Sequence, residues 1–233
     1  MVKIRLFVAA FLILALTACG IRVSHVDWID FVQFNGIQYI AVGYFGGASG
    51  RDLVDADLGS EFARVKNKCA GTTLFEPKCS RDGDAAYLEV GTLVYIVKGY
   101  NPEFRLAAYR GDRLVLYEAD TNPKAQTGAD LLDIGGKVRY IGVNSEQDGV
   151  TELATITDPE QVAVLVELVL GAPVDQSRRD YGVTQYFIAF HLRDGTIVSR
   201  GYSPGRLNRG IILPEEFGTA IEQALLTTNP TAP

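Results

Sequence analysis

Three tight-turn signals constrain the fold of this chain more than any other feature. Asn35-Gly36, Gly111-Asp112 and Asp194-Gly195 each separate two runs in which apolar and polar residues alternate. Glycine beside Asn or Asp adopts the positive φ angles of a two-residue hairpin turn, and a turn this short joins only antiparallel strands. The first turn would place Phe34 opposite Ile37. The chain is therefore expected to contain antiparallel sheets built from hairpins.

Residues 28–135 are predicted to form a mostly antiparallel β region. Beyond the first hairpin, segments 92–100 and 104–119 have the alternation and β-branched content of two or three further strands. The polar, turn-rich segment 119–136 predicts a long loop or a linker.

Residues 136–226 are predicted to form an α+β region in the order β-β-α-β-β-α. Its first helix begins after Asp158, which can cap it, and ends at Gly171. Its second helix runs from Pro214 to about Leu226. The apolar spacing of the first helix places Val162, Leu165, Val166 and Val169 on one face, which Val164, Leu168 and Leu170 widen, so this helix is expected to be buried against a sheet. The fold class expected is thus α+β, with helices packed on an antiparallel sheet, in one domain or two. The tail, residues 227–233, is expected to be disordered and dispensable.

The N-terminal segment has the features of an export signal. Lys3 and Arg5 precede an uninterrupted apolar run of eleven residues, Leu6 to Leu16. A bilayer-spanning helix needs about 20 residues, so this run is too short to span and has the length of a signal-peptide core. Residues 1–18 are therefore predicted to be a signal peptide, and residues 19–27 a tether.

The segment Leu16-Thr17-Ala18-Cys19-Gly20 resembles the lipobox of bacterial lipoproteins. The resemblance implies that Cys19 is diacylated on sulfur and becomes the mature N-terminus, held by membrane lipid. Gly20 stands where an Asp would retain such a protein at the inner membrane. The expected location is the outward-facing side of the bacterial cell membrane, or the outer membrane if the host has one. An ordinary secretory signal with an incidental Cys is the alternative.

Two further segments carry a wider resemblance. The strand "WIDFVQFNGIQY", residues 28–39, and the pattern "ITDPEQV…APVD…YFIAFHLRDGTIVSRGY…LPEEF", residues 156–217, are similar to uncharacterised exported lipoproteins of Gram-positive-type bacteria. The resemblance covers most of the mature chain. It implies a location and no activity, because those relatives have no assigned chemistry.

The charge balance excludes one class of partner. Removal of residues 1–18 takes away two basic residues, Lys3 and Arg5, and no acid, so the net charge falls from −6 to −8. Nucleic-acid binding draws on clustered Lys and Arg, so we expect no nucleic-acid partner.

Cys69 and Cys79 are the two cysteines left in the mature chain after Cys19. An even pair in an oxidising compartment is typical of a disulfide. Closing so short a loop would stabilise the fold by about 2–3 kcal/mol. The spacing does not match a redox or zinc motif, so we predict a structural disulfide and no metal.

No catalytic motif is evident in the sequence. The chain has two histidines, His25 and His191, and lacks a nucleophile elbow, a zinc-protease helix and any cofactor motif. We therefore predict a non-catalytic binding or envelope-associated module. The alternative is an envelope hydrolase that cleaves glycans with two carboxylates, which a pocket lined by two or more acids would favour.

The last hairpin offers a candidate binding face. If Asp194-Gly195 is a two-residue turn, Arg193 faces Thr196 and five residues share one sheet face: Phe187, His191, Arg193, Arg200 and Tyr202. Between Gly171 and Leu213 the chain carries six Arg against three Asp. Such a face could receive the carboxylate or phosphate of an anionic small molecule, a glycan or an envelope protein. The alternative is a solvated hairpin surface.

Lipidation of Cys19 is directly testable. Mass spectrometry of the membrane-extracted protein is expected to find a mature chain that begins at a diacylated Cys19. An unmodified Cys19 contradicts the lipoprotein prediction.

Overall fold

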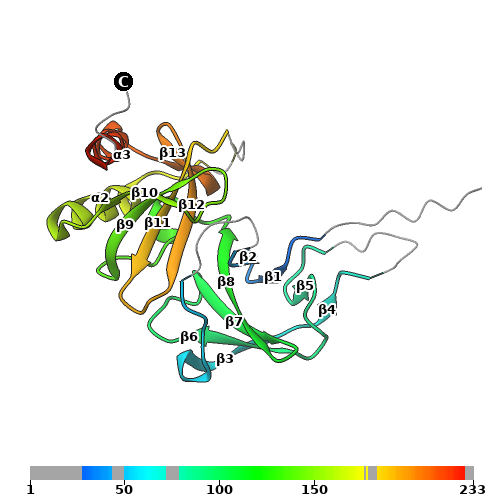
Figure 1. The fold of residues 1–233 in the computed structure, drawn as a ribbon. Coiled ribbons are helices and arrows are strands. Elements are labelled where there is room, and N and C mark those ends of the chain that lie inside the picture. The colour runs from blue at the N-terminus through cyan, green and yellow to red at the C-terminus, as the bar shows by residue number, and fades with distance from the viewer. Residues whose placement is uncertain (1–27, 44–49, 72–78, 176, 178–182, 229–233) are drawn as a thin grey trace, which may run out of the picture.

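The computed structural model describes residues 28–43, 50–71, 79–175, 177 and 183–228. Two sheets and two helices make up this part of the chain, which confirms the α+β class (Figure 1). The predicted signal peptide, Cys19 and the tether lie outside the described residues, as do residues 229–233 of the tail.

The first sheet has eight strands in the order β3-β6-β7-β8-β2-β1-β5-β4. Neighbouring strands are antiparallel except for β4 and β5, which are parallel. Asn35 and Gly36 both have positive φ and place Phe34 opposite Ile37, as predicted. The strands are β1 (Phe31–Phe34), β2 (Ile37–Ala41), β3 (Leu58–Arg64), β4 (Asn67–Lys68), β5 (Asp84–Ala85), β6 (Leu93–Val97), β7 (Arg105–Arg110) and β8 (Arg113–Thr121).

The second sheet has six antiparallel strands in the order β10-β9-β11-β12-β13-β14. Both helices pack their buried residues into one core with it. The predicted order β-β-α-β-β-α lacks two short strands, β13 and β14, which lie between β12 and the last helix. The elements are β9 (Val138–Ser145), β10 (Glu152–Ile156), α2 (Pro159–Gly171), β11 (Tyr186–Leu192), β12 (Ile197–Ser203), β13 (Arg206–Leu207), β14 (Ile211–Ile212) and α3 (Glu215–Thr228). Short 3-10 turns occur at Asp55–Asp57, Gly128–Asp130 and Asn208–Gly210.

Helix α2 forms as its sequence predicts. The Asp158 carboxylate accepts a hydrogen bond of 2.8 Å from the Gln161 amide, and Pro159 occupies the first turn, where its missing N–H costs nothing. Its apolar stripe is buried at Val162, Leu165, Val166 and Val169, whereas Val164, which was expected to widen that stripe, is 59% exposed. Helix α3 extends two residues past the predicted end, to Thr228, and buries Phe217 and Ile221.

The loop predicted for residues 119–136 packs tightly against the second sheet's core. Leu131, Leu132 and Ile134 are buried in the same cluster as the apolar stripe of α2. Gly128 is needed for this packing, because a Cβ there would lie 2.0 Å from the Val169 carbonyl oxygen. The segment is thus part of the core rather than an exposed linker.

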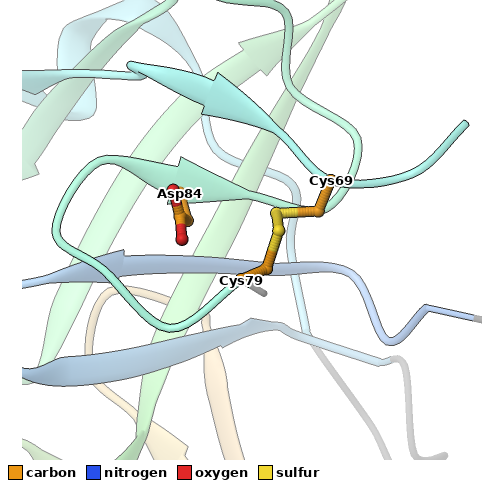
Figure 2. Close-up of side chains that lie close together, drawn as sticks. All are labelled: Cys69, Cys79 and Asp84. Atoms are coloured by element: carbon orange, nitrogen blue, oxygen red, sulfur yellow. A yellow bond between two sulfur atoms is a disulfide. The ribbon is translucent and has the colours of Figure 1, made fainter. Parts of the chain in front are cut away.

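The predicted disulfide between Cys69 and Cys79 is present. Figure 2 shows it beside Asp84. It joins β4 to the segment that leads into β5, and Cys69 packs in a small core cluster with Phe31 and Ile40.

A buried ion network joins the two sheets. Glu118 on β8 receives two hydrogen bonds from Arg105 on β7, of 3.0 and 2.7 Å, and one of 2.8 Å from Arg200 on β12. Burial alone would raise the pKa of Glu118, but Arg200 and Arg105 outweigh it and hold this pKa at about 2. Burial and the nearby Arg209 lower the pKa of Arg200 to about 10, so Arg200 stays charged at neutral pH.

The substitution Glu118→Gln is expected to destabilise the protein by about 3–5 kcal/mol at neutral pH, because it leaves two buried guanidinium groups without their counter-charge. Urea unfolding measures the loss. The folded pKa lies below the unfolded one, so Glu118 contributes its stability above about pH 4.5 and loses it as the pH falls toward 2.

The difference in unfolding free energy between parent and Glu118→Gln should therefore shrink across that window. Glu61→Gln is the matched control, because the Glu61 side chain is 58% exposed and pairs with Arg64 at the surface. An equal effect of both substitutions would contradict the role of the buried network.

Candidate functional site

The β11–β12 hairpin differs by one residue from its predicted register. Its turn contains three residues, Arg193 to Gly195, and the Leu192 amide donates to the Thr196 carbonyl oxygen. His191 therefore lies opposite Ile197, and the predicted pairing of Arg193 with Thr196 is wrong. The Asp194 carboxylate accepts from both the amide and the hydroxyl of Thr196, which stabilises the longer turn.

The five residues of the predicted binding face consequently do not share one face. Arg200 and Tyr202 lie on the opposite side of the hairpin from Phe187 and His191, because side chains alternate along a strand. Arg193 lies in the exposed turn, where its Nε donates to the Gly136 carbonyl oxygen.

Arg200 and Tyr202 belong to the interior. The Arg200 side chain is 3% exposed and is paired with Glu118. Tyr202 is buried and packs against the Phe217 ring. Arg200 and Tyr202, which were predicted to lie on a binding face, are thus part of the protein interior.

Phe187 and His191 lie on the other face of the sheet. The His191 ring is stacked on Tyr140, with ring centroids 3.9 Å apart, and its Nε2 is 3.0 Å from Glu152 Oε1. Burial lowers the pKa of His191, while the Glu152 carboxylate opposes this shift.

A cleft in the first sheet brings three arginines together. It has a volume of about 360 Å³, within the range of small-molecule sites. We call it the arginine cleft and define it by Arg51, Arg110 and Arg113. Two acids, Asp30 and Asp52, also line it. Its remaining lining residues are mostly apolar: Ala41, Val42, Gly43, Leu53, Leu114, Val115 and Leu116.

The β7–β8 hairpin positions two of these arginines. The Gly111-Asp112 turn, with Gly111 at φ +66°, places Arg110 directly opposite Arg113. Arg110 is held by an ion pair of 2.9 Å to Asp30, and its guanidinium carbon lies 4.6 Å from the centre of the Tyr87 ring.

Arg51 forms the opposite wall of the cleft. It makes two hydrogen bonds, of 2.7 and 2.8 Å, to the Asp57 carboxylate, and its Nε donates to the Asp194 carbonyl oxygen. Hydrogen bonding to Arg51 is the main reason that the pKa of Asp57 is held at about 2. Arg51 therefore connects the cleft wall to the β11–β12 turn.

Asp30 is the buried acid of the cleft. Burial raises its pKa, and the Arg110 guanidinium and the Tyr117 hydroxyl oppose that shift. Its Oδ2 accepts from Arg110, and its Oδ1 accepts from the Tyr117 hydroxyl at 3.2 Å. Both oxygens of this carboxylate are thus engaged within the protein.

Arg113 differs from the other two arginines. It is exposed, and no acid among the described residues forms an ion pair with it. Like charges directly opposite each other on neighbouring strands destabilise a sheet. Asp30 offsets the charge of Arg110 and Asp57 that of Arg51, so Arg113 is the arginine of the cleft whose charge the described acids leave uncompensated.

Comparisons with protein-family models, curated proteins and solved structures found no match for this chain. The function must therefore be argued from the sites themselves.

One potential metal-ligand group, formed by Cys69, Cys79 and Asp84, does not fit a metal (Figure 2). The two sulfur atoms are bonded to each other, so neither is the thiolate that a metal requires. Asp84 already accepts from the Arg81 amide.

Sequence reasoning missed the arginine cleft because its walls come from segments far apart in the chain. One local signal could have found part of it. In Arg110-Gly111-Asp112-Arg113, a two-residue turn necessarily places the flanking arginines opposite each other.

Proposed function

We propose that this chain is a lipid-anchored protein of the bacterial envelope that binds an anionic group in its arginine cleft. The location rests on the lipobox resemblance at Cys19 and on the Cys69–Cys79 disulfide, which suits an oxidising compartment. Among the described residues, no helix is both long and apolar enough to cross a membrane.

The observation that carries the binding proposal is the unpaired Arg113 opposite Arg110. A carboxylate or phosphate between them would remove the repulsion and gain charge-assisted hydrogen bonds. Val115, an apolar lining residue on the same face of β8 as Arg113, suits the hydrocarbon part of a small anion or the ring face of an acidic sugar. The proposed ligand class is therefore a small molecule or glycan that bears a carboxylate or phosphate.

The cleft proposal is tested with the soluble form, residues 20–233, titrated with inorganic phosphate and with succinate by calorimetry. Arg113→Glu is expected to weaken binding about tenfold or more, since a hydrogen bond to a charged group contributes about 1.5–3 kcal/mol. The same substitution should leave stability unchanged or slightly higher, because it removes the like-charge pair.

Arg193→Glu is the matched control, because it makes the same charge change in an exposed turn outside the cleft. Loss of binding in this variant alone would move the site to the β11–β12 turn. Equal losses in both variants would show that only net charge matters, and absence of binding by the parent would count against the cleft.

A second candidate function is the carboxylate hydrolase, which one observation favours. Asp30 and Asp52 line the same cleft, and burial raises the pKa of Asp30, as a general acid requires. We rank it second because Arg110 and Tyr117 already engage both Asp30 oxygens. A screen of envelope glycans should then show cleavage by the parent and by Asp112→Asn, a control at the hairpin tip, but none by Asp52→Asn. Cleavage by all three proteins would exclude this mechanism.

A further inference from the structure

Three metal-ligand atoms converge above one glycine on the sheet face that carries Phe187 and His191. Gly142 lies in β9, the strand next to the edge strand β10 of the second sheet. A Cβ placed on it would lie 2.9 Å from Glu152 Oε1, 3.0 Å from Asn144 Oδ1 and 3.3 Å from His191 Nε2. The absence of a side chain at Gly142 therefore leaves a small space that these atoms surround. We call Asn144, Glu152 and His191 the β9 cluster.

The strand register explains how the β9 cluster forms. Asn144 of β9 lies opposite Glu152 of β10 on one side and opposite Phe187 of β11 on the other. His191 lies opposite Tyr140, two residues before Gly142, so it shares their face. A register shift immediately after Glu152 marks a β-bulge, a feature that re-aims side chains near functional sites.

The hydrogen bonds of the β9 cluster leave one of its ligand atoms, the Asn144 Oδ1, without a donor. Asn144 is 1% exposed, and its Nδ2 donates to the Gly149 carbonyl oxygen at 3.0 Å. This bond turns the Asn144 Oδ1 toward the cluster, where it is buried and has no donor. His191 Nε2 is buried as well, and it contacts the Glu152 carboxylate, with Oε1 at 3.0 Å. Buried polar atoms are normally paired, so the Asn144 Oδ1, which faces the same space as the His191–Glu152 contact, calls for a ligand.

We propose that the β9 cluster is a binding site for a divalent transition-metal ion, with His191 Nε2, Glu152 Oε1 and Asn144 Oδ1 as its protein ligands. All three atoms can offer lone pairs, which a cation satisfies together. Ligands about 2.0–2.2 Å from one ion stand roughly 3 Å apart when they are adjacent, as Glu152 Oε1 and His191 Nε2 do.

The ligand types indicate the class of metal. An imidazole nitrogen favours zinc and related transition metals, whereas calcium and magnesium prefer sites made of oxygen atoms alone. Stacking on Tyr140 fixes the plane of the His191 ring, and the hydrogen bond to Gly149 fixes the Asn144 amide. The Glu152 side chain is 37% exposed, so the site has access to solvent for exchange and for further water ligands.

The competing interpretation is a contact between His191 and Glu152 with an ordered water on Asn144. It predicts no binding of transition metals at this place. The two interpretations differ in a measurable way.

The test uses metal-free residues 20–233, titrated with Zn²⁺ by calorimetry and with Co²⁺ by visible absorption, in a buffer without phosphate or carboxylate. A single Zn²⁺ per chain and a Co²⁺ ligand-field spectrum are expected, with no comparable effect of Mg²⁺. His191→Ala and Glu152→Ala should each weaken Zn²⁺ binding at least about tenfold. Gly142→Ala should weaken it as well, because the added Cβ crowds all three ligand atoms.

His25→Ala is the matched control, since His25 is the other histidine of the chain. It should bind Zn²⁺ as the parent does. Circular dichroism shows whether each variant remains folded, and Glu152→Ala, at an exposed residue, keeps the test valid if Gly142→Ala does not fold. Absence of Zn²⁺ binding at millimolar concentration, or binding that is lost in His25→Ala and kept in His191→Ala, would overturn the proposal. Neither outcome bears on the arginine cleft.

Discussion

One buried carboxylate, that of Glu118, lies at the centre of the polar contacts that join the two sheets. Its two oxygens are shared between Arg105 of the first sheet and Arg200 of the second. Arg105 is fully buried, and its Nη1 also donates to the Thr196 hydroxyl, directly before β12 of the second sheet. Because each of these hydrogen bonds requires a fixed direction, the network allows only one arrangement of β7, β8 and β12.

Such a network specifies a structure more than it stabilises one. Removing charges from water costs several kcal/mol per ion, and apolar residues of similar volume often stabilise a core equally well. An arrangement that separated Glu118 from its arginines would, however, leave three buried charges unpaired, and competing packings are penalised heavily. The loop that contains Leu131 and Ile134 packs against the second sheet's core and so supports the same arrangement with apolar contacts.

Features set by neighbouring residues could be predicted from the sequence, and features set by distant ones could not. The Asn35-Gly36 hairpin, helix α2 and the disulfide follow from local turn chemistry, capping and cysteine pairing. The β11–β12 register failed because Asp194-Gly195 also fits a three-residue turn, and one residue moves every side chain to the other face. Arg200 and its partner Glu118 are 82 residues apart in the sequence, so no local pattern indicates that this arginine is buried.

Some polar groups in this protein are paired with other protein groups, and others are not. We interpret the paired groups as structural and the unpaired ones as candidate ligand-binding groups. The surplus of arginine near the last hairpin suggested a binding surface, yet Arg200 and Arg209 pair internally with Glu118 and Asp120. Arg200 retains Nε and Nη2 atoms without a partner, but they lie inside the core, where an ordered water is the usual partner. Arg113 and the β9 cluster differ, because Arg113 is exposed and the buried Asn144 Oδ1 faces the same space as Glu152, whose side chain is 37% exposed. A ligand gains free energy at such groups and none at those already paired within the protein. Binding is therefore expected where the fold leaves charge or lone pairs uncompensated, rather than where charged residues are most numerous.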